Sequence, residues 1–131
     1  MIRVVADTHA LVWALANDSR LSPAARAAFA PAGNDTVGVS SISLAELLYL
    51  EEKSRLPAGT LGRLKSVLGT PDWALEEVPF SLVIVDAMAR LSRDQVPDLP
   101  DRIIAATALH LGVPLITRDR QITASGIATI W

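Results

Sequence analysis

The sequence predicts an α/β fold, a three-layer sandwich with a central, mainly parallel sheet. Short runs rich in β-branched residues alternate with longer apolar segments of helical character, and strands separated by helices form parallel sheets covered on both faces. The chain has 131 residues, of which 50% are hydrophobic and 20% charged, which suits one domain with a substantial core. No repeat or linker interrupts the pattern, so we expect a single domain over residues 1–131.

Five short segments are predicted to be strands. Ile2–Ala6 is a β-branched run that ends at Asp7, and Thr36–Ser40 is a second apolar run. A third strand is expected within Ala74–Val78. The last two predicted strands are Val113–Thr117 and Ile127–Trp131.

The segments between these strands are predicted to be helices by their starts and stops. Asp7 or Thr8 can cap the first helix, and Ser22 followed by Pro23 is a typical start for the second. Gly112 ends the last helix. The predicted helices are His9–Ala16, Pro23 to about Pro31, Ser43–Lys53, Thr60–Leu68, Ser81–Ser92 and Asp101–Leu111.

The composition excludes several classes of function. Cysteine is absent, which excludes disulfides, cysteine-type zinc sites and thiol catalysis. No apolar run is long enough for a membrane span or a secretory signal, so we expect a soluble protein of the cytoplasm. The formal net charge is −2, so the whole protein does not attract polyanions. Any attraction for nucleic acid must be local or carried by a metal ion.

Two acidic residues follow predicted strands directly. Asp7 comes after the first strand and Asp119 after the segment Val113–Thr117. Ligands of open parallel sheets bind beyond the carboxyl ends of the strands, which is where these two acids are expected. The simpler explanation for each is a helix or turn cap, because aspartate is common at such positions.

Glu46 is the single charged residue in the segment Ser40–Leu50. A carboxylate among apolar neighbours needs a reason to be there. One explanation is a capping box formed with Ser43, in which Glu46 bonds to the start of its own helix. That position would still leave Glu46 near the edge of the sheet.

Asp98 and Asp101 lie at the start of the last predicted helix, with Asp98 as its expected N-cap. Both can be explained by favourable interaction with the helix dipole. Arg102, which follows Asp101, is a candidate ion-pair partner for these acids.

Considered together, four of these acids favour a metal site. Carboxylates that meet at one sheet edge repel one another unless a cation or a proton lies between them. Sites made of carboxylates alone suit Mg²⁺ or Mn²⁺ better than zinc. Such ions activate water and bind phosphate oxygens, which points to phosphodiester hydrolysis. The four acids are Asp7, Glu46, Asp101 and Asp119.

The chain resembles the PIN-domain ribonucleases, and within them the VapC toxins of VapBC toxin–antitoxin pairs. The resemblance covers the length of the chain and is carried by four motifs in order. These are VADTHALVWAL, SSISLAE, DLPDRIIAATAL and GVPLITRD. Many members of the family have DPFDR where this chain has DLPDR, so the proline is shifted while both acids and the arginine stay in place.

The resemblance implies a role for each of these residues. Asp7, Asp101 and Asp119 would hold Mg²⁺, or Mn²⁺ in its place, while Glu46 would bind a second ion or act as the base that deprotonates the attacking water. The supporting residues that it implies are Thr117, which would orient Asp119, together with Asp98 and Arg102 of the D-x-x-D-R pattern.

The same resemblance implies Mg²⁺-dependent endonucleolytic cleavage of RNA, a homodimer, and inhibition by a cognate VapB-type antitoxin. The chain has no basic DNA-reading segment, so we expect no direct DNA binding. Arg102, Arg118 and Arg120 lie beside the acids in the sequence and are candidates for contacts with flanking phosphates.

The sequence disfavours two other classes of function. Among phosphoryl-transfer domains, a haloacid-dehalogenase-type phosphatase needs D-x-D after the first strand, but the third position here is His9. A response-regulator receiver needs an acidic pair there and a lysine after a late strand, and neither Lys53 nor Lys65 is so placed. A non-catalytic PIN-like module that binds RNA or protein is the second alternative. Retention of all four acids disfavours it.

Overall fold

The computed structural model describes all of residues 1–131. Its five strands are β1 (Ile2–Ala6), β2 (Thr36–Ser40), β3 (Leu75–Val78), β4 (Leu115–Ile116) and β5 (Thr129–Ile130). Its seven helices are α1 (Thr8–Leu15), α2 (Pro23–Phe29), α3 (Ser41–Glu52), α4 (Thr60–Val67), α5 (Leu82–Met88), α6 (Leu99–Leu111) and α7 (Arg120–Ala124).

The strands form one parallel sheet in the order β3-β2-β1-β4-β5. The central strand β1 pairs with β2 on one side and β4 on the other, so Val5 lies opposite both Gly38 and Leu115. Strands β2 and β3 are added in sequence order on one side of β1, and β4 and β5 are then added on its other side. The order therefore reverses between β1 and β4, which is where open parallel sheets bind ligands.

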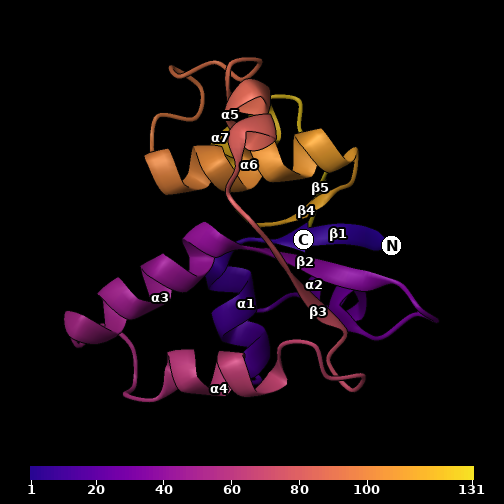
Figure 1. Ribbon diagram of the computed structural model, residues 1–131, viewed down its shortest axis with the longest axis vertical. Helices are drawn as coiled ribbons and strands as arrows, with labels where there is room; N and C mark the ends of the chain where they lie inside the picture. Colours follow the sequence, from indigo (N-terminus) through magenta and orange to yellow (C-terminus); the bar gives the residue numbers. More distant parts are fainter.

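Helices cover both faces of the sheet (Figure 1). One hydrophobic cluster joins α1, α2, α3 and α4 to one face, and a second joins α5, α6 and α7 to the other. Successive side chains of β1 pack alternately into the two clusters: Val4 and Ala6 belong to the first and Val5 to the second. Burial on both faces explains the unbroken apolar run of this strand and confirms the predicted three-layer α/β sandwich.

The sheet is tight around Gly38 in β2. A Cβ atom at this position would lie 3.1 Å from Cγ2 of Ile2, 3.2 Å from Cγ2 of Val78 and 3.3 Å from Cγ2 of Val5. The glycine therefore lets three side chains pack over the middle of the sheet.

The start of α3 differs from the prediction. The helix begins at Ser41, with Ser40 as its N-cap, and the Ser40 hydroxyl accepts from the backbone N–H of Ile42 at 3.2 Å. Ser43 is therefore inside the helix, and the capping box of Ser43 with Glu46 is wrong. The prediction failed because two serines in succession offered a cap earlier than the S-x-x-E pattern did.

Four further elements differ from the prediction. Helix α5 ends at Met88, because the chain then tightens into hydrogen bonds between residues three apart, such as Arg90 N–H to Ala87 O. Helix α7 was not predicted, since its five residues show no apolar periodicity. Strands β4 and β5 are each two residues long where five were expected. None of the helices combines the length and the apolar character that crossing a bilayer would require.

Candidate active site

Three acids from three separate parts of the chain line one hollow at the edge of the sheet. Asp7 follows β1, Asp119 follows β4, and Asp101 lies in the first turn of α6. The volume of this acidic hollow is about 310 Å³. Its lining residues are Asp7, His9, Trp13, Asp101, Arg118 and Asp119.

Asp7 and Asp119 are oriented by the helices that they cap. Oδ1 of Asp7 accepts from the backbone N–H of Ala10 at 2.7 Å. Oδ1 of Asp119 accepts from the N–H groups of Gln121 at 2.8 Å and Ile122 at 3.3 Å. Each of these caps uses Oδ1 only, so capping fixes the carboxylate while Oδ2 takes no part in it. The capping explanation and the functional one are therefore compatible.

The start of α6 is built in the same way. Oδ2 of Asp98 accepts from the backbone N–H of Asp101 at 3.1 Å, which confirms Asp98 as the N-cap. The side chain of Asp101 accepts no hydrogen bond, so both of its oxygens are available.

Glu46 does not line the acidic hollow, but it lies close to its acids. Repulsion from Asp98 and Asp7 contributes to the raised pKa of Glu46, and Glu46 in turn contributes to the raised pKa of Asp101. The Thr8 hydroxyl donates to Oε1 of Glu46 at 2.6 Å, and Oγ of Ser43 lies 2.9 Å from Oγ1 of Thr8. Because Thr8 has one hydroxyl proton and gives it to Glu46, Ser43 must be the donor in the second bond. Both hydroxyl residues are buried, so this short chain of bonds holds Glu46 in place.

Burial and neighbouring acids raise the pKa of Asp7, Glu46 and Asp101. Burial raises the pKa of Asp7, against the opposing effect of the nearby Thr117 hydroxyl, and burial also raises the pKa of Glu46. For Asp101, burial together with repulsion from Asp98 and Asp119 raises the pKa to about 7. The only ion pairs in the protein are those of Asp18 with Arg20 and of the N-terminal amine with Asp35. None of the acids of the site therefore forms an ion pair, although His9 and Arg118 line the same hollow.

The chemistry of this site fits a hard divalent ion. The acids offer oxygen ligands only, and their uncompensated negative charge favours a bound cation. No three of the acidic or histidine side chains stand close enough together to share one ion in this conformation. Unscreened repulsion keeps such carboxylates apart, so binding an ion would require them to turn inward.

Two of the supporting residues have clear structural contacts. Thr117 is buried, and its Oγ1 accepts from the backbone N–H of Asp119 at 3.0 Å, which fixes the turn that carries Asp119. Arg102 donates through Nη2 to the carbonyls of Met88 at 2.9 Å and Leu91 at 3.4 Å.

The suggested ion pair of Arg102 with its neighbouring acids is therefore wrong. Its guanidinium instead donates to the carbonyl of Met88, the last residue of α5, and to that of Leu91 just beyond the helix. Arg102 also does not line the acidic hollow, which removes the observation that favoured it as a phosphate contact. Its contribution is to tie α6, and with it Asp101, to α5.

His9 is the site residue that the sequence did not reveal. Its spacing matches no zinc motif, yet its exposed side chain lines the acidic hollow and partly offsets the raised pKa of Asp7 and of Glu46. The available signal was its place in the first turn of α1, two residues after Asp7. Arg118 also reaches the hollow, with its guanidinium carbon 4.4 Å from the centre of the Trp13 ring.

A five-stranded parallel sheet with acids gathered where its strand order reverses defines an α/β domain with a candidate ligand site at that edge. The chain belongs to the PIN-domain family, whose model matches residues 4–126. It is 31% identical over 122 residues to "Ribonuclease VapC22" of Mycobacterium tuberculosis, which covers 93% of this chain and 91% of that protein.

Solved structures show the same fold. VapBC2 from Rickettsia felis, bound to a DNA fragment from the promoter, aligns with a TM-score of 0.72 and 24% identity, covering 98% of this chain and 97% of that one. VapC20 of Mycobacterium tuberculosis, described as a sarcin-ricin loop cleaving toxin, aligns with a TM-score of 0.65 and 16% identity, covering 95% and 96%.

Proposed function

We propose that this protein is a Mg²⁺-dependent endoribonuclease, the toxin of a VapC type toxin–antitoxin pair. Membership of the PIN-domain family and the 31% identity to a VapC ribonuclease support the nuclease activity. The structural similarity to a toxin that cleaves the sarcin-ricin loop points to the same class of substrate. The proposal treats residues 1–131 as one PIN domain that acts on RNA in the cytoplasm.

One observation carries this proposal. Asp7, Asp101 and Asp119 come from distant parts of the sequence and line one hollow, and none of them forms an ion pair, although His9 and Arg118 line the same hollow. Such an arrangement opposes folding, because each carboxylate raises the cost of ionising the others. Groups that are held in this costly state at the ligand-binding edge of a sheet are candidates for function.

In the proposed mechanism, Asp7, Asp101 and Asp119 hold Mg²⁺, with Mn²⁺ as a substitute. When bound, the ion supplies a water of lowered pKa and a positive charge for the phosphate oxygens. Glu46 either takes the proton of the attacking water or holds a second ion, and the Thr8–Ser43 pair keeps its carboxylate oriented. Thr117 fixes the Asp119 turn, and solvent protonates the leaving oxygen.

We further propose that a VapB-type antitoxin inhibits this protein and that the protein itself is a homodimer without DNA-binding activity of its own. An antitoxin would place an amphipathic segment on the apolar helices and extend an arginine to the acids, where a guanidinium can replace a metal ion. The structural neighbour from Rickettsia felis is a VapBC complex on DNA, which supports a partner of this kind.

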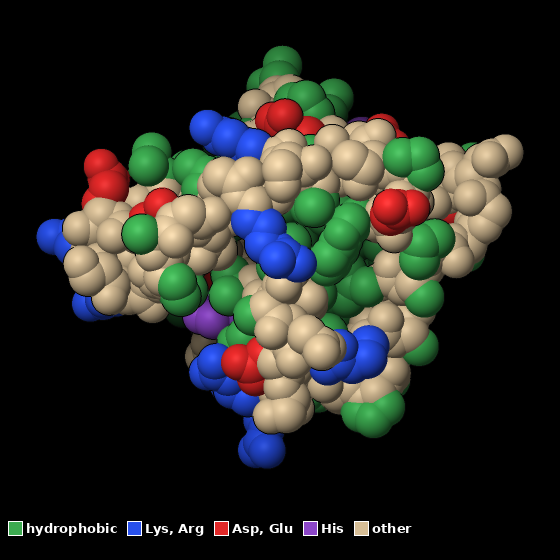
Figure 2. Space-filling view, turned by 90° about the horizontal axis from the view of Figure 1, so that it is seen from below, with side chains coloured by type: hydrophobic (Ala, Val, Ile, Leu, Met, Phe, Trp, Pro, Cys, Tyr) green, Lys and Arg blue, Asp and Glu red, His purple; other side chains and the backbone are tan.

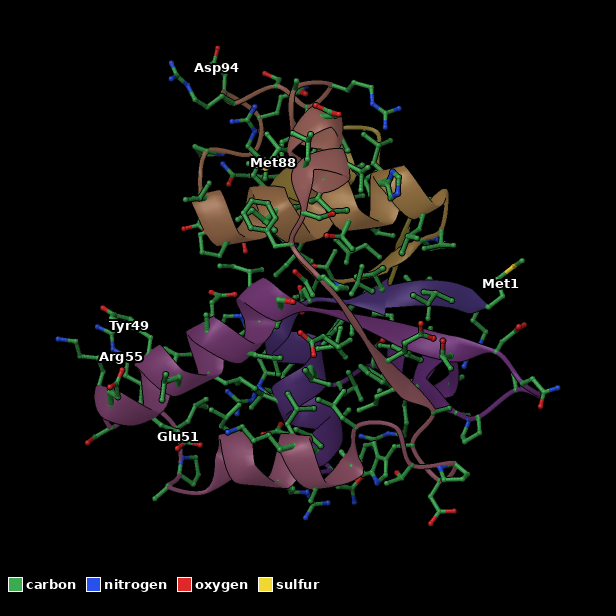
Figure 3. All side chains as sticks on the ribbon, viewed as in Figure 1. Met1, Tyr49, Glu51, Arg55, Met88 and Asp94 are labelled. Carbon is green, nitrogen blue, oxygen red and sulfur yellow. The ribbon has the colours of Figure 1, made fainter.

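We expect such a segment to pack on the apolar helices around Trp13 and Leu47–Leu50. Within this surface Trp13 is 4% exposed and Leu47 is fully buried. The accessible apolar side chains there are Leu48 and Tyr49, and Tyr49 projects from the outer part of α3 (Figure 3). Hydrophobic side chains also gather on the face of the molecule shown in Figure 2.

The experiment that tests the activity compares the wild-type protein with the Asp7→Asn variant on single-stranded RNA. With Mg²⁺ present, the wild type should cleave and the variant should lose at least about a hundredfold in rate, the scale on which single catalytic groups act. Asparagine is as good an N-cap as aspartate, so the variant should melt at or above the wild-type temperature.

Two results would overturn the proposal. Cleavage by Asp7→Asn at the wild-type rate would remove Asp7 from the mechanism. Wild-type protein that binds RNA but never cuts it in Mg²⁺ would favour the non-catalytic module.

A further inference from the structure

A second hollow adjoins the acidic hollow and has the opposite charge. Its volume is about 730 Å³, and it shares Arg118 with the acidic hollow. We call it the basic hollow. Its lining residues are Thr117, Arg118, Arg120, Thr123, Thr129 and Trp131.

No acidic side chain lines the basic hollow, so Arg118 and Arg120 are its only charged side chains. Both arginines are exposed, and neither forms an ion pair within the protein. The threonine side chains are already engaged: Thr123 donates to the carbonyl of Asp119 at 3.1 Å and lies 3.0 Å from the Thr129 hydroxyl. The free hydrogen-bonding capacity of this wall therefore belongs to the two guanidinium groups.

Arg118 is held at the boundary between the two hollows by aromatic packing. Its guanidinium lies over the ring of Trp13, which is almost fully buried, and Trp131 packs against Trp13 at 5.8 Å between ring centres. Stacking uses the flat face of a guanidinium and leaves its N–H groups free around the edge. Arg118 is thus a positioned cation with unused donors.

The neighbouring charges require a polyanionic ligand that extends across both hollows. A phosphodiester strand carries one negative charge per nucleotide, so one phosphate in the acidic hollow brings the next phosphate close by. The carboxylates repel that next phosphate, whereas paired arginine donors bind it well. A single free anion would gain nothing from the connection between the two hollows.

We propose that the basic hollow binds the phosphate next to the one that is cleaved, with Arg118 and Arg120 as its ligands. This inference rests on the proposed ribonuclease function and adds the path of the RNA strand: from the acids, past Trp13, toward α7 and β5. Arg118 then acts as a positioning residue, because it sets the strand in register with the acids without touching the scissile bond.

The test measures RNA binding apart from cleavage. In the Asp7→Asn background, which leaves RNA intact, Arg118→Gln/Arg120→Gln is compared with the matched control Arg55→Gln/Arg93→Gln. Glutamine removes the charge and keeps most of the side-chain length that packs on Trp13. Arg55 lies beyond the C-terminal end of α3 (Figure 3), and neither control residue lines a hollow. Binding of a labelled single-stranded RNA is followed by fluorescence anisotropy at several salt concentrations.

Loss of this one phosphate contact should lower the slope of log affinity against log salt by about 0.7, which is the contribution of one neutralised phosphate on a single strand. Affinity should fall roughly tenfold or more at moderate salt. The control pair should leave the slope unchanged. In the wild-type background the same arginine variants should raise KM more than they lower kcat, as expected for uniform binding.

An unchanged salt slope in the Arg118/Arg120 variant would overturn the assignment of the basic hollow. Equal losses in the test and control variants would do the same, because they would show only a general charge effect. Competition by inorganic phosphate beyond its contribution to ionic strength would show a free-anion site and not a strand path. The proposed function fails separately, if wild-type protein leaves RNA uncut in Mg²⁺ while the Asp7→Asn form still binds it.

Discussion

Replacing Asp101 with asparagine should stabilise the metal-free protein at alkaline pH. The Asp101 carboxyl has a pKa of about 7 in place of 3.8, because burial and the neighbouring acids disfavour its charged form. Asparagine has nearly the same shape and carries no charge. Since the side chain of Asp101 accepts no hydrogen bond, the substitution removes the repulsion and breaks no contact.

The size of the effect follows from the raised pKa. At 1.36 kcal/mol for each pH unit, the full difference between 3.8 and about 7 would correspond to about 4 kcal/mol at high pH. Asp101 is only half-buried, so solvent screening reduces this to about 2 kcal/mol. Loss of a favourable charge in the first turn of α6 costs roughly 0.3–1 kcal/mol. We therefore expect a net gain of about 1 to 2 kcal/mol.

The sign of the pH dependence is fixed by the direction of the shift. A carboxyl with a raised pKa in the folded state binds its proton more tightly there than in the unfolded chain. The wild type should therefore have its full stability near pH 4 and lose part of it as pH rises through 7. The Asp101→Asn variant should lack that loss, so the two proteins should be similar near pH 4.5 and differ most above pH 8.

Urea unfolding in EDTA at pH 4.5 and pH 8 measures this difference. At pH 8 the variant should unfold at a midpoint higher by about 0.5 to 1 M urea, given slopes of about 1–3 kcal/mol per molar. Adding Mg²⁺ should stabilise the wild type more than the variant, because the ion binds the folded carboxylates. A variant that is less stable than the wild type at pH 8 in EDTA would refute the repulsion on which the site assignment depends.

Three further predictions concern the ion, the inhibitor and the sheet. Mg²⁺ or Mn²⁺ should support cleavage, whereas Ca²⁺ should bind with little activity because it is larger and more loosely coordinated. EDTA should abolish cleavage reversibly, and full activity in chelator would exclude a metal mechanism. A small protein encoded beside this one should co-purify with it and restore growth, and replacing its acid-contacting arginine should abolish inhibition; normal growth on expression of this protein alone would contradict the toxin assignment. Gly38→Ala should lower the free energy of unfolding by about 1–3 kcal/mol, because the new methyl group crowds Ile2, Val5 and Val78; an unchanged midpoint in urea would show that the sheet can relax there.

The sequence predicted the positions of most of the acids because those positions are local properties of the chain. Asp7 directly follows β1, Asp119 comes three residues after β4, and parallel strands bring their ends to one edge. Asp98 was predicted as a cap from its place before an apolar helix, and it is one. These inferences need only the order of the elements and the chemistry of helix starts.

The features that the sequence did not reveal depend on contacts between distant segments. The bond from Thr8 to Glu46 joins residues 38 positions apart, and no local pattern specifies it. His9 has no ligand spacing, and its presence in the site follows from how α1 leaves β1. Arg102 was expected beside acids, but the carbonyls that follow α5 offered better acceptors. Sequence neighbours suggested an ion pair, whereas packing decided where the side chain went.

The double use of aspartate, as helix cap and as site acid, has a consequence for how this scaffold changes over evolutionary time. Asparagine and serine cap helices about as well as aspartate does, so neutral replacements of Asp7 or Asp119 preserve α1 and α7 while removing the charge. Selection for folding alone would not oppose such replacements and, by relieving repulsion, would favour them. A descendant that lost the acids and their activity would keep the same backbone. The fold of such a domain therefore indicates common ancestry only. The residue types at these few capping positions indicate whether the activity is still under selection.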